Sequence, residues 1–197
     1  EERELRERAW GRYLREVRAD RPEQIDALTA LGVEPDDLEH YFERLCEHPE
    51  LDPHVNAPES VPDLDAAVAE AQERLRDWQA HRPDEHPEGR DDVMQAFDRA
   101  AKMITHSNLE TPAQKASFLE VFADVSDEDS ADVTLKCWRG PQTDSYDWAR
   151  TLRDELLPAL VRETIQPALR QWRAYVHREV VAFVRPAVEV FAELRRE

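Results

Sequence analysis

The stretch YDWARTLRDELLPALVRETIQPALRQWRAYVHREVVAFVRPAVEVFAELRRE, residues 146–197, decides the fold of this chain. Its apolar residues recur at steps of mostly three and four, the spacing of one face of an α-helix. They are Val161, Ile165, Leu169, Trp172, Val176, Val180, Phe183, Ala187, Phe191 and Leu194. At about 1.5 Å per residue this face extends over roughly 50 Å, enough to receive the shorter helices upstream. Pro158, Pro167 and Pro186 lack the backbone N–H of a helix interior, so we expect kinks or restarts there.

The chain upstream is expected to form shorter amphipathic helices, because its apolar residues also recur at helical spacing. N-terminal helices fill residues 1–46, middle helices lie within 63–125, loops fill 47–62 and 80–90, and long C-terminal helices fill 145–197. Gly32 suits the position just after a helix end, and Thr111 followed by Pro112 is typical of a helix start. Residues 133–141 alternate briefly and hint at extended structure.

The predicted fold class is all-α: an irregular multi-helix domain built around long, proline-interrupted C-terminal helices. Only four glycines occur, which argues against β-hairpins. The length fits a single helical domain, residues 1–197. Because the chain has no initiator methionine, we expect it to be excised from a larger protein. No internal repeat of fixed period is apparent.

The formal net charge is −18, and the acidic residues are concentrated in the middle of the chain. Residues 21–144 hold 11 basic and 30 acidic side chains. Such a surface fits a salt-adapted, halophilic protein, whose acidic side chains keep it hydrated, and it equally fits a face that docks a basic partner. Both explanations stay open at this point.

Cysteine usage and hydropathy indicate a cytoplasmic location. Cys46 and Cys137 lie far apart in the sequence, and two free thiols are favoured over a disulfide. No apolar run approaches the roughly 18 residues of a membrane-spanning helix, and no signal peptide is visible. We therefore expect no membrane partner.

Motifs for several kinds of active site are missing from the sequence: the phosphate-binding GxxxxGK(S/T) loop, the GxSxG elbow, HExxH and CxxC. Asp91 and Asp92 begin something like the paired-aspartate signature of helical prenyl-transfer enzymes. Gln95, however, stands where the third carboxylate should be, so we interpret the pair as a solvated helix start. No catalytic residue is predicted.

One group of side chains has the residue types of a metal site. His40, Glu43 and Glu47 could share one face of a helix, which is the type of residue and spacing that a metal ion needs. Arg44 lies on the same face, and its cation would oppose a bound metal. We therefore predict no metal site and no cofactor within these residues.

Two segments at opposite ends of the chain carry placed aromatic residues in a recognisable order. The first, residues 6–45, contains Trp10, Tyr13, Leu31, Gly32, Pro35, Asp37, Leu38, Phe42 and Leu45. The second, residues 169–197, contains Trp172, Arg173, Tyr175, Arg185, Pro186, Ala187, Val188 and Glu189, and a basic-aromatic element, Thr134–Trp138, precedes it. Together they resemble the accessory insertion, subdomain 1B, of UvrD/Rep-type superfamily 1 DNA helicases, most closely the RecB and AddA kind. The resemblance covers residues 1–50 and 130–197.

This resemblance implies a non-catalytic accessory domain of an ATP-dependent DNA helicase that acts in unwinding, repair and recombination. Its partners would be forked or single-stranded DNA and the ATPase core of the same protein. ATP and Mg²⁺ would belong to the parent protein, whose phosphate loop lies before such an insertion. The alternative is a stand-alone acidic helical module that binds a basic protein.

A net charge of −18 repels DNA, so only a local basic patch could bind it. The predicted patch is Lys136, Trp138 and Arg139, two cations around an aromatic ring that could stack on a base, with Lys102 and Lys115 added. The alternative for Trp138 is a buried ring beside a surface pair. The N-terminal arginines Arg8, Arg12 and Arg15 are interpreted as surface pairs with acidic residues four positions away.

Overall fold

The computed structural model describes residues 2–48, 57–82, 91–126, 138 and 145–196. Regular structure in these residues consists of helices, with no strand among them, which confirms the predicted all-α class. Contacts divide the chain into two compact units: unit 1 is Glu1–Val61 with Gln171–Glu197, and unit 2 is Pro62–Arg170. Each unit has its own packing centre, and the single domain stays a prediction. The extended structure expected at 133–141 lies outside the described residues, except for Trp138.

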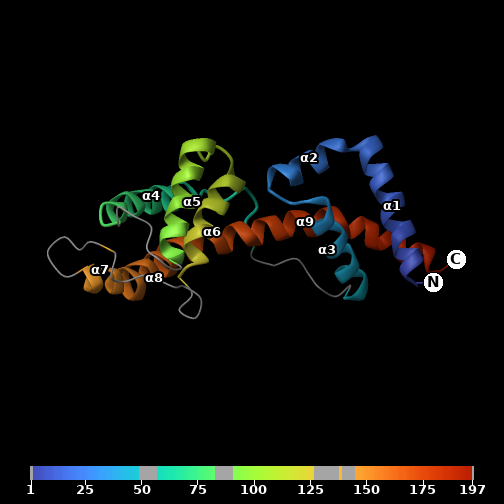
Figure 1. The fold of residues 1–197 in the computed structure, drawn as a ribbon. Coiled ribbons are helices and arrows are strands. Elements are labelled where there is room, and N and C mark those ends of the chain that lie inside the picture. Colours follow the sequence, from blue (N-terminus) through green and yellow to red (C-terminus); the bar gives the residue numbers. More distant parts are fainter. Residues whose placement is uncertain (1, 49–56, 83–90, 127–137, 139–144, 197) are drawn as a thin grey trace. The chain divides into compact units, whose positions relative to one another are not determined.

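Unit 1 is built from α1 (Glu2–Asp20), α2 (Pro22–Ala30), α3 (Pro35–Glu47) and the part of α9 (Gln166–Leu194) that belongs to it (Figure 1). The helices occupy the predicted stretches. Gly32 follows the end of α2 with a φ of 79°, a left-handed conformation that glycine adopts without strain, so its predicted role is confirmed.

The core of unit 1 joins the apolar faces of α1 and α3 to α9. Trp10 stacks on Phe42 with ring centroids 5.2 Å apart, and Tyr13 meets the edge of Phe183 at 5.5 Å. The Tyr13 hydroxyl donates a hydrogen bond to the Phe183 carbonyl oxygen. Burial raises the pKa of Tyr13, so the hydroxyl keeps its proton and remains a donor at neutral pH. These contacts tie residues 170 positions apart in sequence into one core.

Unit 2 contains three middle helices, α4 (Asp65–Gln79), α5 (Asp92–Ser107) and α6 (Pro112–Ala123), followed by α7 (Ser145–Thr151) and α8 (Leu157–Leu160). Phe97 lies at its centre. The Phe97 ring stacks on Trp78 at 5.8 Å, meets Trp138 at 5.8 Å nearly at right angles, and lies 6.3 Å from Phe122. Large aromatic rings therefore fill this core at preferred pair geometries.

The apolar stripe predicted along residues 161–194 faces inward. Its buried members are Val161, Ile165, Leu169, Trp172, Val180, Phe183, Ala187 and Phe191, and Val176 and Leu194 are half-buried. Helical spacing alone was enough to find this face, because one side of a helix can be buried only by residues three and four apart.

Two of the three prolines of this stretch stand where an α-helix restarts, as predicted, because α8 begins at Leu157 and α9 begins at Gln166. A π-helical turn, Leu152–Leu156, ends two residues before Pro158, and a second, Val161–Ile165, ends two residues before Pro167. A π turn changes the hydrogen-bond pattern and so accommodates the ring that would clash with the carbonyl four residues earlier. Pro186 lies inside α9, so the restart expected there does not occur.

A short internal repeat underlies this pattern. Residues 152–160, LRDELLPAL, and residues 161–169, VRETIQPAL, share an aliphatic residue, Arg, an acid and a closing Pro-Ala-Leu. Each copy begins with one of the two π turns. The expectation of no repeat was wrong. A unit of nine residues is shorter than the 20–50 residues of most repeat architectures and merges into an ordinary helical stripe.

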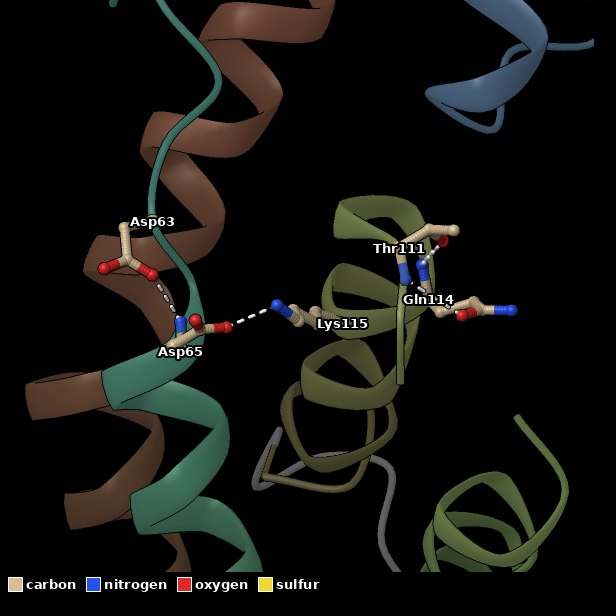
Figure 2. Close-up of polar contacts among 5 residues, drawn as sticks. All are labelled: Asp63, Asp65, Thr111, Gln114 and Lys115. Carbon is tan, nitrogen blue, oxygen red and sulfur yellow. Dashed lines mark hydrogen bonds and ion pairs between the residues drawn. The ribbon is translucent and has the colours of Figure 1, made fainter. Parts of the chain in front are cut away.

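The start of α6 lies at Thr111, as the sequence predicts, and it carries a capping box. The Thr111 hydroxyl accepts from the Gln114 N–H at 3.2 Å, and the Gln114 side chain accepts from the Thr111 N–H at 3.1 Å (Figure 2). We expect Thr111→Ala to lower the free energy of unfolding by about 0.5–2 kcal/mol, because a helix N–H loses its acceptor. Denaturant unfolding measures this loss. Thr111→Ser, which keeps the hydroxyl, should retain most of the stability, and an equal loss in both variants would contradict the cap.

Candidate nucleic-acid interface

The patch predicted around Trp138 is described only in part, since Lys136 and Arg139 lie outside the described residues. Trp138 itself is 0% exposed. Its indole N–H donates to Asp91 Oδ2 at 2.9 Å, and its ring packs against Phe97. A ring in this position is not available to stack on a base, and its burial matches the alternative left open by the sequence. DNA contact through Lys136 and Arg139 stays a prediction.

The partner of Trp138 is the residue that starts α5. Asp91 is 3% exposed, and its other oxygen, Oδ1, accepts from the Met94 N–H at 2.9 Å as an N-cap. The interpretation of Asp91 and Asp92 as a helix start is confirmed, but the solvation assumed for them is wrong, since both are buried. An Asp before an apolar helix indicates the cap, whereas the sequence carries no local signal for the Trp138 contact 47 residues away.

The two added lysines have different surroundings. Lys102 is exposed on α5. Lys115, on α6, forms an ion pair with Asp65 in the first turn of α4, and Asp63 accepts from the Asp65 N–H at 2.8 Å (Figure 2). Lys115 therefore links two helices of unit 2, and its charge is paired within the protein.

A group of exposed arginines lies instead on α1. Arg8, Arg12 and Arg15 are exposed, and in the part of the chain that the structure describes none of them makes a hydrogen bond or ion pair. The surface pairs expected for them are therefore wrong. Glu7, which is next to Arg8 in the sequence, binds Arg3 at 3.0 Å instead.

These arginines line a shallow groove of about 600 Å³ in unit 1. Its lining is Glu4, Glu7, Arg8, Gly11, Arg12, Arg15 and Leu194. The groove was missed because acids and arginines alternate along α1, and this composition suggests mutual neutralisation. The helical positions of the three arginines, at steps of four and three, were the available signal.

Unit 1 also contains a pocket of about 470 Å³ beside α2 and α9. Tyr13, Leu28 and Phe183 supply apolar lining, and Arg21 and Glu179 add charge. This composition suits contact with an apolar side chain next to a polar group.

The two remaining chemical possibilities concern thiols and metals. Burial raises the pKa of the Cys46 thiol to about 11, so it is protonated at neutral pH and a poor nucleophile. Among the described residues, no three His, Cys, Asp or Glu side chains gather in a way that could hold a metal ion. Glu47, one of the three residues considered as metal ligands in the sequence, accepts a hydrogen bond from Arg6 at 2.9 Å.

None of the described helices combines the length and hydrophobicity needed to cross a lipid bilayer. The chain matches no protein-family model, no curated protein and no solved structure.

Proposed function

We propose that this chain is a non-catalytic helical accessory domain of an ATP-dependent DNA helicase. In this role it supports the ATPase core of its parent protein and contacts DNA near the junction of duplex and single strand. ATP and Mg²⁺ bind the parent's core rather than these residues, and a cytoplasmic location is part of the proposal.

One observation carries the proposal: residues of both resembling segments pack into a single core. Trp10, Tyr13, Phe42 and Leu45 come from the first segment, and Ala187 comes from the second. All five are buried in the same cluster of unit 1. Three aromatic positions that resemble the helicase insertion, Trp10, Tyr13 and Phe42, are therefore part of the core of this unit.

The arrangement of the two ends of unit 1 also supports the proposal. The Arg6 guanidinium carbon lies 5.9 Å from the centre of the Phe191 ring, and Leu5 and Leu194 pack against the same core. The beginning of α1 and the end of α9 thus lie side by side (Figure 1). An insertion leaves and re-enters its parent domain at nearby points, and this geometry satisfies that requirement.

The test uses the full-length protein whose gene encodes this chain. We expect it to contain a phosphate loop, to hydrolyse ATP faster when DNA is present and to unwind a forked duplex. Replacing residues 2–196 with a short Gly-Ser linker should leave basal ATP hydrolysis and abolish unwinding.

A variant of the parent's phosphate-loop lysine is the matched control, because it should lose both activities. A full-length protein without a phosphate loop would contradict the proposal and favour the stand-alone acidic module. Unwinding that is unchanged by the linker replacement would also contradict it.

A further inference from the structure

We propose that Arg8, Gly11, Arg12 and Arg15 form a contact surface for the phosphate backbone of a DNA strand. This inference rests on the proposed function and assigns its DNA contact to a face of α1. We call these four residues the α1 arginine face.

The four residues form one continuous stripe because they occupy positions i, i+3, i+4 and i+7 of α1. At about 1.5 Å per residue, Arg8 and Arg15 are separated by roughly 10 Å along the helix axis. Three guanidinium groups over that length can contact more than one phosphate of a strand. A helix of 19 residues supplies a rigid support for them.

The arginines of this face have donors to offer. Each guanidinium carries five N–H groups in a planar fork that matches two phosphate oxygens. The chain holds 44 acidic residues, yet within the described ranges these three arginines are exposed and bond to none of them. An exposed arginine without an internal partner can bind an external anion without first breaking an ion pair.

Gly11 is a second and independent observation. Glycine is the poorest helix former after proline, so a glycine inside a helix calls for a reason. The packing of the protein does not supply one: a Cβ placed on Gly11 would meet nothing within 4 Å. The missing side chain instead leaves the helix backbone open beside the arginines, which lets a ligand approach closely.

The acidic residues near the face set the expected strength of binding. Glu4 and Glu7 line one end of the groove, and Glu7 is bound to Arg3. These two carboxylates repel a phosphate in the groove and so weaken its binding. Acidic residues more than a Debye length away, about 8 Å at physiological ionic strength, are largely screened. Binding should therefore be weak, centred between Arg8 and Arg15, and strongly dependent on salt.

The first experiment measures fluorescence anisotropy of a labelled forked DNA with the whole chain across a salt series. The test variant is Arg8→Gln/Arg12→Gln/Arg15→Gln. The control, Arg76→Gln/Arg99→Gln/Arg170→Gln, changes the net charge equally at exposed positions of unit 2. We expect the test variant to bind at least about tenfold more weakly and to reduce the slope of log K against log salt by about 2–3. The control should change affinity less than about threefold.

The second experiment separates contact from folding through Gly11. Gly11→Gln introduces a good helix former into open space, so its melting temperature should equal or exceed that of the wild type. Its longer side chain should nevertheless obstruct the strand and weaken DNA binding several-fold. Gly11→Ala should raise the melting temperature with a smaller effect on binding.

Three outcomes would overturn the α1 arginine face. These are equal losses in the test and control variants, unchanged affinity in both the triple arginine variant and Gly11→Gln, and no binding of the wild-type chain at low salt. The ATPase and unwinding measurements on the full-length protein decide the proposed function separately, so failure of this surface leaves that result intact.

Discussion

An Asp91→Ala variant should lose about 2–4 kcal/mol of unfolding free energy. The substitution removes the N-cap of α5, which typically contributes about 0.5–2 kcal/mol. It also leaves the buried Trp138 N–H without the acceptor that lies 2.9 Å away, and an unsatisfied buried donor costs about 1–3 kcal/mol. Equilibrium unfolding in urea, followed by tryptophan fluorescence and circular dichroism, measures the loss.

Two further variants identify the cause of that loss. Asp91→Asn should be intermediate, because its single carbonyl oxygen can accept from Met94 or from Trp138 but not through two separate oxygens as the carboxyl does. Trp138→Phe removes the indole donor, so adding Asp91→Ala to it should cost less than in the wild type. A loss below about 1 kcal/mol for Asp91→Ala would show that this contact adds little to stability.

Trp172→Ala should lose about 3–5 kcal/mol, as truncation of large core residues generally does. Trp172 is 6% exposed on α9, and its ring centroid lies 6.3 Å from that of Tyr175. Removal of the indole exposes its apolar neighbours and leaves a cavity that a rigid helix can fill only partly. Thermal and denaturant unfolding both report the change.

Arg170→Ala provides a control on the same helix. Arg170 is exposed two positions before Trp172, and a surface substitution of this kind usually changes stability by less than about 0.5 kcal/mol. If Trp172→Ala cost no more than about 1 kcal/mol, the inward-facing stripe would be assigned to the wrong side of the helix.

Features that depend on neighbours in the sequence could be predicted. The cap at Thr111, the left-handed Gly32 and the inward stripe of α9 each follow from residues within one or two helical turns. Local chemistry decides them, because a cap needs an acceptor at one position and a stripe needs only helical spacing.

Features that depend on residues far apart in the sequence could not be predicted. Nothing near Trp138 in sequence indicates that its N–H meets Asp91, and a tryptophan between two cations resembles a stacking platform until its burial is known. The α1 arginines present the same difficulty. Glu4 and Glu16 stand four residues from Arg8 and Arg12, yet in the described part of the chain they form no ion pair with them, so spacing alone does not decide which arginines pair.

The nine-residue repeat at residues 152–169, which ends in the first turn of α9, has a consequence for how this helical stretch can change length in evolution. In a pure α-helix nine residues make about two and a half turns, so equivalent positions would alternate between opposite sides. With a π turn in each copy, both members of the pairs Leu152 and Val161, and Leu160 and Leu169, are buried. Gain or loss of a whole copy would keep these two positions inward. Loss of one residue would rotate the two flanking segments by roughly 100° relative to each other. Related chains should therefore differ here by nine residues more readily than by one.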